Sequence, residues 1–398
     1  MRLNITTWHD YFSDKTPTLK VLMGRLFFGP VLLLALSGTT LSAAEQGSAI
    51  QTDHFLSSRP ENLSWGWFPL DNEPVLTIQS GETVSIDTLT HVGGAQSQEP
   101  VAYLSEMGVS RDEMLQDMLD FWPTRQNRPR EGRSGHIITG PVFIEGAEPG
   151  DTLEIQILDI QPRVTWGVNS TGPGRGVLSN RYPGYRDGDQ TLDIPSERHL
   201  IRTEEIDGRR VAVLAPNIHV PLAPFMGIMA VAPAPEVGQP GVTVPGVQSS
   251  TPPGAFGGNL DVKDLKAGST LYLPVFQTGA LFYTGDPHAA QGDGEVSGTA
   301  IEQSMNGAFR FIVHKGESIT NPRAETETHH LLMGIDLDLD RAMREAVLEV
   351  VDFLVAEKGL SPAKAVSLAS IAVDFRVGEV VDLTQVVVGY VPKEIFID

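Results

Sequence analysis

Residues 136–160 read HIITGPVFIEGAEPGDTLEIQILDI, and they contain two runs of β-forming residues separated by a glycine-containing turn. In the second run, residues 152–158, apolar and polar side chains alternate, which is typical of a strand with one buried face. Residues 146–150 end in a Pro-Gly dipeptide, which favours a turn between the runs. The stretch therefore predicts two successive strands and indicates a mainly β fold.

The composition of the chain agrees with this prediction and excludes several classes of function. With 40 glycines and 28 prolines among 398 residues, a loop-rich β protein of one large domain or two to three smaller ones is expected. The formal net charge of −21 disfavours partners with many phosphates, both nucleic acids and anionic membranes. The chain has no cysteine, which excludes disulfides, thiolate metal sites and a cysteine nucleophile.

Other short patterns predict individual elements. Residues 75–78 and 83–87 are β-rich runs around a Ser-Gly turn and predict a hairpin. Residues 226–231 are all apolar apart from one glycine and predict a buried strand. Residues 110–121 begin with a serine that has a glutamate three residues later, a capping box that predicts a short helix.

The chain is predicted to have two β-rich parts with a linker between them. Residues 232–258 are rich in proline and glycine, and they separate an N-terminal β-rich part (45–231) from a C-terminal part (259–398) that also contains helices. Within 340–357 the apolar residues recur on one helical face, and a Ser-Pro dipeptide at 361–362 is typical of the start of a second helix. We expect this C-terminal helical pair to cover the β core.

Residues 1–44 have the three-part pattern of a signal peptide. Arg25 supplies a positive charge, residues 26–36 form an apolar core, and Ser42-Ala43-Ala44 are small residues suited to cleavage. Because the first 22 residues are polar, translation is expected to start at Met23. A periplasmic or secreted protein is therefore predicted, without membrane association after cleavage.

Residues 285–295, GDPHAAQGDGE, are the strongest candidate for a functional site. Asp286 and His288 are two residues apart, as are Asp293 and Glu295, so each pair can lie on one face of extended backbone. Imidazole and carboxylate groups suit Zn²⁺ or a similar divalent ion. The residues alone leave a solvated acidic loop equally open, and they leave His91 unassigned. The motifs of serine hydrolases with a nucleophile elbow, dinucleotide-binding folds, P-loop proteins and HExxH metalloproteases are absent from the sequence.

Four separated blocks of the chain resemble the acetamidase/formamidase family. The blocks are GPVFIEGAEPGDTLEI (140–155), PFMGIMAVAP (224–233), the stretch from GGNLDVKDLKAGSTLYLPV (257–275) to GALFYTGDPHAAQGDGEVSGTAIE (279–302), and the tail with IDLDLDRAMREAVLEVVDFL and VPKEIF. The resemblance covers most of residues 70–397. It implies a mainly β protein with α+β additions around a β-sandwich-like core. It also implies a homo-oligomer and hydrolysis of formamide, acetamide or similar small amides to ammonia and a carboxylate.

The resemblance also suggests which residues carry the chemistry. With no activated nucleophile recognised, we expect water activated by a divalent metal, with Zn²⁺ as the preferred ion. His136, Asp286 and His288 are the ligand candidates, with Asp87 as a weaker fourth. Glu145 or Glu295 is the candidate general base, and Asp293 is a further catalytic candidate. Lys263 is expected to polarise the oxyanion. The candidates for substrate binding are Gln291 and Asn259, and Asn259 could also polarise the oxyanion.

Two departures from the family pattern keep other functions open. Gly254 stands where members often have an arginine, and Phe256 stands where they often have a histidine. A periplasmic protein that binds a small molecule without turnover is one alternative. A hydrolase of another C–N substrate, such as a carbamate or ureide, is the other.

Overall fold

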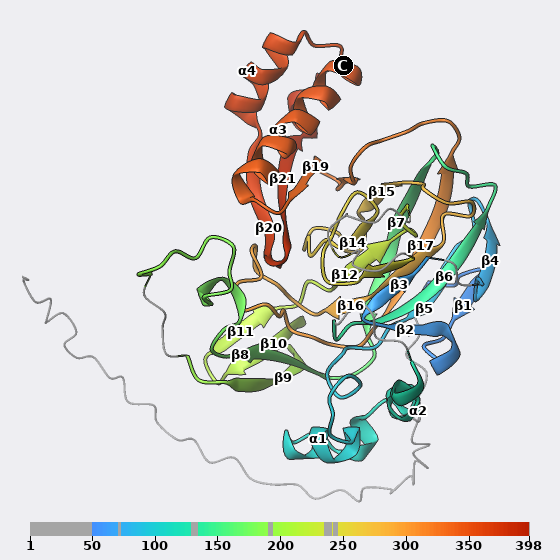
Figure 1. The fold of residues 1–398 in the computed structure, drawn as a ribbon, viewed down its shortest axis with the longest axis vertical. Helices are drawn as coiled ribbons and strands as arrows, with labels where there is room; N and C mark the ends of the chain where they lie inside the picture. The colour runs from blue at the N-terminus through green and yellow to red at the C-terminus, as the bar shows by residue number, and fades with distance from the viewer. Residues whose placement is uncertain are drawn as a thin grey trace, which may run out of the picture. The chain divides into compact units, whose positions relative to one another are not determined.

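The fold is described from a computed structural model, which covers residues 50–70, 73–128, 134–189, 194–234, 241 and 246–397. The predicted signal peptide lies outside these described residues. Residues 45–398 belong to one compact unit. Most of its regular elements are strands, as the mainly β prediction requires (Figure 1). None of the described helices is both long and apolar enough to span a membrane.

Two large sheets contain most of the strands. The nine-stranded sheet consists, in spatial order, of β1 (His54–Leu56), β5 (Thr83–Asp87), β17 (Met305–His314), β7 (Thr152–Pro162), β15 (Thr270–Pro274), β18 (Arg323–Glu325), β19 (His329–Asp336), β21 (Thr384–Pro392) and β20 (Asp374–Asp382). The six-stranded sheet consists of β14 (Gly257–Asn259), β12 (Phe225–Ala230), β16 (Phe282–His288), β6 (Ile137–Glu145) and β2 (Leu63–Trp65), with β4 (Leu76–Gln79) also paired to β6.

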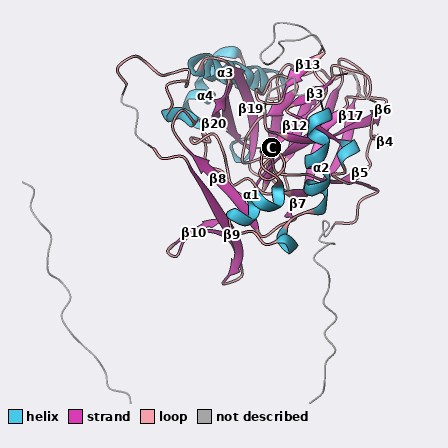
Figure 2. Cartoon of the chain, turned by 60° about the horizontal axis from the view of Figure 1, so that its bottom comes forward, coloured by secondary structure: helices cyan, strands magenta, loops and turns pink. Residues whose placement is uncertain are grey.

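Smaller elements surround these sheets. A four-stranded sheet of β11 (Ile218–Pro221), β10 (Arg209–Ala215), β9 (Glu197–Ile206) and β8 (Trp166–Thr171) extends to one side (Figure 2). A two-stranded sheet pairs β13 (Val247–Ser249) with β3 (Trp67–Pro69). The helices are α1 (Pro100–Glu106), α2 (Gln116–Thr124), α3 (Leu339–Ala356) and α4 (Pro362–Ala372); the short 3₁₀ segments are η1 (Pro60–Asn62), η2 (Arg111–Glu113), η3 (Arg125–Asn127), η4 (Gly176–Leu178) and η5 (Lys393–Ile395).

The apolar core lies where the two large sheets meet. Phe282 of β16, in the six-stranded sheet, contacts Phe309 and Phe311 of β17, in the nine-stranded sheet, with ring centroids 6.0 and 4.9 Å apart. All three side chains are fully buried. Because burial of large aromatic side chains dominates core energetics, these contacts hold the two sheets together.

Both β-rich parts of the chain contribute strands to the same sheets. β5 and β7, from before residue 232, pair with β17 and β15, from after residue 258. Likewise β12 pairs with β14 and β16. The strands on either side of residues 232–258 are therefore interleaved within one compact unit.

Two local predictions are met and one is wrong. The apolar run at 226–231 corresponds to β12, and every residue of that strand is buried. The capping box of Ser110 and Glu113 is present, although it begins η2, and the longer helix α2 starts only at Gln116. The predicted hairpin does not form, because β4 pairs with β6 while β5 pairs with β1 and β17. The Ser-Gly turn thus connects the two large sheets.

Helix α3 packs on β19 and β21 through small side chains (Figure 1). Ala342 and Ala346 are fully buried, and a Cβ atom on Gly334 of β19 would lie 2.2 Å from the backbone of both residues. The close approach of helix and strand therefore requires alanine and glycine at the contact. Met343, one of the apolar residues within 340–357, is 38% exposed and therefore lies off the buried face of the helix.

Candidate active site

The end of β16 delivers two of the predicted site residues to the interior. This strand lies between β12 and β6 in the six-stranded sheet, and all seven of its residues are buried. It ends with Asp286, Pro287 and His288. The chain then forms a loop and returns, so that Glu302 pairs with His288 in an isolated antiparallel bridge. The loop therefore places a carboxylate beside the imidazole at the strand end.

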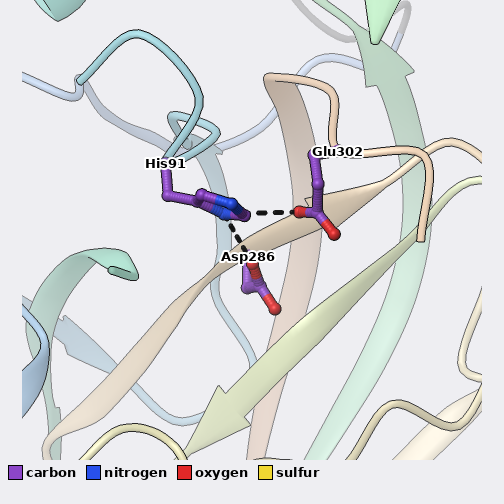
Figure 3. A group of neighbouring side chains, drawn as sticks. All are labelled: His91, Asp286 and Glu302. Carbon is purple, nitrogen blue, oxygen red and sulfur yellow. Dashed lines mark ion pairs between the residues drawn. The ribbon is translucent and has the colours of Figure 1, made fainter. Parts of the chain in front are cut away.

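Three histidines from separate segments surround the Asp286 carboxylate. Nδ1 of His91 lies 3.7 Å from Oδ1, whereas Nε2 of His136 and Nε2 of His288 lie 3.7 and 3.3 Å from Oδ2. Glu302 is close to two of these rings. It lies 3.5 Å from Nδ1 of His91 (Figure 3) and 3.3 Å from Nε2 of His288. We call these five residues the histidine–carboxylate cluster.

A second group of carboxylates adjoins this cluster. Asp261, Glu295 and Asp382 offer oxygens that all lie within 4.8 Å of one another. Asp261 links the two groups, because its Oδ1 is 3.4 Å from Nδ1 of His288. Asn259 donates from Nδ2 to Asp382 at 2.9 Å. We call Asp261, Glu295 and Asp382 the carboxylate group.

The orientation of His288 is determined by its neighbours. Nδ1 of His288 donates to Oε1 of Gln291 at 3.0 Å, and Nε2 of Gln291 donates to the backbone oxygen of Asp261 at 2.8 Å. The ring also packs edge-on against Phe225, with centroids 5.1 Å apart. With Nδ1 occupied, Nε2 of His288 faces the carboxylates of Asp286 and Glu302.

The opposite charges in the histidine–carboxylate cluster shift its pKa values strongly. Burial raises the pKa of Asp286, but the positive charges of His136 and His288 outweigh this effect and hold it well below its usual range. Burial lowers the pKa of His288, but Glu302 and Asp286 raise it to well above its usual range. Asp286 is therefore ionised and His288 readily protonated when no other cation is present.

The carboxylate group has the opposite behaviour, because it concentrates negative charge. Burial raises the pKa of Asp261 to about 7, against the lowering effect of His288. Burial and the charge of Asp261 raise the pKa of Glu295 well above its usual range. The pKa of Asp382 is raised by burial and by Glu379. Burial and mutual repulsion therefore favour the protonated forms of these carboxylates unless a cation compensates their charge.

Several buried atoms at the site have no hydrogen-bond partner among the described residues. They are Nδ1 of His91, Nε2 of His288, both carboxylate oxygens of Asp261, Oε2 of Glu302, Oδ1 of Asn259 and Oε1 of Glu379. Unsatisfied buried polar atoms are costly, and they are accordingly rare. Imidazole nitrogens and carboxylate oxygens in this arrangement are the donor set of Zn²⁺ and related divalent ions. The residues present therefore fit such an ion.

Strained backbone accompanies the acidic side chains. Asp261, Asp286 and Glu295 have φ of 47°, 49° and 44°, in the left-handed region that residues other than glycine rarely adopt. Such conformations cost about 1–3 kcal/mol each and tend to occur at functional sites. The fold thus maintains three unfavourable conformations at the place where the acidic groups meet.

The model of the Acetamidase/Formamidase family matches residues 129–240 and 242–398. The chain belongs to the Acetamidase/Formamidase family. A relative from Schizosaccharomyces pombe that carries a formamidase name is 30% identical over 276 residues, covering 59% of this chain and 60% of that protein. The formamidase of Methylophilus methylotrophus is 26% identical over 66% of this chain and 77% of its own length.

A solved structure supports the same relationship. The acetamidase from Bacillus halodurans has a TM-score of 0.66 and 30% sequence identity, and the match covers 86% of this chain and 98% of that one. Formamidase and acetamidase, the names that these relatives carry, denote hydrolases that act on non-peptide C–N bonds. The chain thus shares both sequence and fold with this family of amide hydrolases.

The structure brings together most of the predicted site residues of this family member. His136, Asp286 and His288, the predicted metal ligands, lie in the histidine–carboxylate cluster. Glu295, a predicted general base, lies in the carboxylate group. The predicted substrate-binding residues, Asn259 and Gln291, contact these groups through their side chains.

Two predicted residues lie elsewhere. The Asp87 carboxylate is 3.3 Å from the guanidinium of Arg163 and accepts from Asn306 at 2.8 Å, so it belongs to another ion pair and does not join the ligand set. Glu145, the other predicted base, is exposed at the last position of β6, next to a surface turn. Its exposure removes the reason to assign it a buried proton-transfer role.

Lys263 and Asp293 form an ion pair at the margin of the site. Nζ of Lys263 lies 3.0 Å from Oδ1 of Asp293, and both side chains are about one-third exposed, at 33% and 34%. The pairing neutralises the lysine locally. Its charge is therefore shared with Asp293 before any substrate binds.

Sequence reasoning missed part of the site. The residues alone do not assign His91, and Asp261 and Glu302 lie within the family-like blocks 257–275 and 279–302 with no role predicted for them. Glu379 and Asp382 carry no motif, because they lie in the second half of β20, distant in sequence from GDPHAAQGDGE. Pairing of Gly294 with Glu379 in an isolated parallel bridge brings that part of the strand to the site.

Proposed function

We propose that this protein hydrolyses the C–N bond of short linear amides, of the formamide and acetamide type, to ammonia and a carboxylate. The observation that carries the proposal is the buried histidine–carboxylate cluster, in which several nitrogen and oxygen atoms have no hydrogen-bond partner among the described residues. The names of the relatives support the choice of amide substrates. The proposed scaffold is a β-sandwich-like core with the helices α3 and α4 at its C-terminal end.

A divalent metal ion, with Zn²⁺ as the first choice, is part of the proposal. His91, His136, Asp286, His288 and Glu302 would hold it, because their donor atoms converge and several of them form no hydrogen bond within the described part of the chain. Such an ion, when bound, acidifies water and polarises a carbonyl oxygen. Gln291 contributes by keeping Nδ1 of His288 occupied, so that Nε2 remains directed at the shared carboxylates.

Proton transfer is assigned to Glu295. Hydrolysis of an amide requires a group that takes a proton from water and returns it to the leaving nitrogen. Glu295 is 7% exposed, it lies beside His288 and Glu302, and its pKa is raised, so that it can hold a proton near neutral pH. Lys263 and Asn259 are the donors assigned to the developing negative charge on oxygen, the lysine after release from Asp293.

The departures at Gly254 and Phe256 do not by themselves require a changed function. The Phe256 ring is 4% exposed and packs edge-on against Phe68 with centroids 5.7 Å apart. It also contacts Gly254 and Gly258 closely enough that a Cβ on either would lie 2.9 Å from the ring. Phe256 is thus accounted for by core packing, which favours the enzyme over a non-catalytic binding protein.

Location and assembly complete the proposal. The signal pattern in residues 1–44 supports export to the periplasm or the medium. The resemblance to the family supports a homo-oligomer. Neither nucleic acid nor membrane is a proposed partner of the mature chain.

The test combines turnover and metal content. Ammonia release is measured for formamide, acetamide, larger amides, a carbamate and a ureide, and bound metal is measured in the same preparation by mass spectrometry. His288→Ala should abolish both turnover and metal binding, because it removes the ring at the centre of the cluster. His314→Ala is the matched control, since that histidine is 31% exposed and pairs with Glu154, which belongs to neither group of the site.

The outcomes discriminate between the alternatives. Activity only on the carbamate or ureide would replace the substrate class while keeping the site. Full amidase activity in metal-free His288→Ala protein would refute the metal-dependent mechanism. Binding of amides without ammonia release from any of the substrates would favour the non-catalytic alternative.

A further inference from the structure

Arg163 is a partly buried cation outside the site and joins several segments. It lies between β7 and β8, and its side chain is 14% exposed. Its guanidinium donates to Oδ2 of Asp117 at 2.8 Å and to Oγ of Ser58 at 2.9 Å, and it lies 3.3 Å from Oδ2 of Asp87. One guanidinium therefore connects α2, the N-terminal segment and the end of β5.

The same residue holds the segment that leads to His91. Nη1 of Arg163 donates to the backbone oxygen of Thr88 at 3.2 Å, three residues before His91. Oγ1 of Thr88 donates to the backbone oxygen of Met305 at 2.8 Å. The start of the 88–91 segment is thus fixed from two sides.

The backbone of Arg163 holds the segment that follows Glu302. Its amide donates to the backbone oxygen of Ser304 at 2.9 Å. The hydroxyl of Ser304 in turn accepts from the backbone amide of Thr90 at 3.0 Å. Arg163 therefore contacts both segments that bring His91 and Glu302 to within 3.5 Å of each other.

Electrostatics favours a cation at this position. Asp87 and Asp117 are 14% and 19% exposed, and the guanidinium of Arg163 lies between their carboxylates. Burial raises the pKa of Asp87, and the charge of Arg163 opposes this effect. Without the cation, two partly buried like charges would face each other beside the carbonyl of Thr88.

We propose that the side chain of Arg163 is a positioning group, which acts through the backbone of Thr88 to hold His91 against Glu302 in the histidine–carboxylate cluster, while the backbone amide at the same position fixes Ser304. The inference rests on the proposed function in that His91 and Glu302 are assigned to metal binding. Replacement of groups that orient metal ligands typically weakens metal affinity or activity by about 10–100-fold. A planar fork with several donors suits the two carboxylates and the carbonyl, whereas a lysine ammonium is a single point of contact.

The experiment compares Arg163→Met and Arg163→Lys with Arg202→Met. Arg202 is the matched control, because its guanidinium pairs with Glu113 and donates to the backbone of Gly108, and so anchors β9 to the η2 region. Zn²⁺ affinity is measured on the purified mature protein by competition with a chelator. Thermal stability, kcat and KM for the best amide substrate, and hydrogen exchange of the amides of residues 88–91 are measured in parallel.

Both Arg163 variants should bind Zn²⁺ about 10–100-fold more weakly than wild type and show faster exchange at residues 88–91. Arg163→Lys keeps the charge, so its thermal stability should be closer to that of the wild type than the stability of Arg163→Met is. Its Zn²⁺ affinity should recover less. Arg202→Met should lose stability and keep the wild-type Zn²⁺ affinity. If Arg163 had a merely structural role, Arg163→Met and Arg202→Met would both lower the thermal stability, and neither would change the Zn²⁺ affinity.

The inference and the proposed function can fail separately. If the wild-type protein binds no Zn²⁺, the metal proposal fails. If, in addition, hydrogen exchange of the amides of residues 88–91 is the same in Arg163→Lys as in the wild type, the inference about Arg163 is overturned as well. If wild type binds Zn²⁺ and Arg163→Lys binds it equally tightly with unchanged kcat, the inference alone is overturned. Should Arg163→Met not fold, Arg163→Lys decides the result.

Discussion

Gly227→Ala is expected to disable the site by adding a single methyl group. Gly227 lies in β12, between Met226 and Ile228, which pair with Pro287 and Gly285 of β16. A Cβ atom on Gly227 would lie 2.5 Å from Oδ1 of Asp261, 2.9 Å from the backbone oxygen of Asp286 and 2.9 Å from Cε1 of His288. The backbone conformation of Gly227 lies outside the left-handed region, so space is the only obstacle to the substitution.

The magnitude follows from these distances. Real Cβ contacts essentially never fall below 3.0 Å, so the Asp261 oxygen would have to move by at least about 0.5 Å. The backbone oxygen of Asp286 has little freedom to move, because it belongs to β16, which pairs with a strand on each side. Since a displacement of about 1 Å at a reacting group can cost a factor of about 100, we expect a loss of about 10–100-fold in kcat/KM, equivalent to about 1.4–2.8 kcal/mol. Overpacking should also lower the free energy of unfolding by about 1–3 kcal/mol.

The assay is ammonia release under first-order conditions, together with metal content and denaturant unfolding. Gly292→Ala is the matched control, because that glycine belongs to the GDPHAAQGDGE loop and a Cβ there would have nothing within 4 Å. Its kinetics and stability should remain at the wild-type level. Wild-type activity in Gly227→Ala would refute the conclusion that Asp261, Asp286 and His288 must keep their positions.

Further predictions concern stability. Phe282→Ala should lower the free energy of unfolding by about 3–5 kcal/mol, because the fully buried ring joins the two large sheets. The control Phe55→Ala, at a 60% exposed position, should change this free energy by about 0.5 kcal/mol or less. Equal losses for the two variants in urea unfolding would contradict the prediction. The pKa of Glu113 is lowered from 4.5 to about 2 by the backbone N–H of Ser110 and by Arg202. Its ionised form therefore stabilises the fold above pH 4.5, and this contribution is lost as the pH falls from 4.5 to about 2. Glu113→Gln should lose less stability than wild type over that range, and an identical pH profile would count against the assignment.

Local patterns were reliable where one segment determines its own structure. The apolar run at 226–231 required a buried strand, and the spacing of apolar residues at 340–357 required a helix, found as α3. The hairpin at 75–87 failed for a reason that lies outside that segment. Its two strands find better partners in different sheets, and no pattern within the segment reports on those partners.

The site was predictable to the extent that its residues are close in sequence. Asp286 and His288 are two residues apart, and their side chains meet. The assignment of Asp87 failed because an acidic residue at a strand end can pair with any nearby cation, and here Arg163 is that cation. Glu379 and Asp382 carry no motif, so only the path of β20 and β21 identifies them as neighbours of Glu295.

The sequence by itself determined the mainly β class, the family and the segment that carries Asp286, His288 and Glu295, because alternation, turns and motif spacing are local properties. Only the tertiary structure decided which side chains share the interior, since convergence of His91, His136, His288 and Asp382 depends on the pairing of strands from distant parts of the chain. The burial that results is also what shifts the pKa values of these groups. The acid–base chemistry of the site is therefore a property of the fold rather than of the motif.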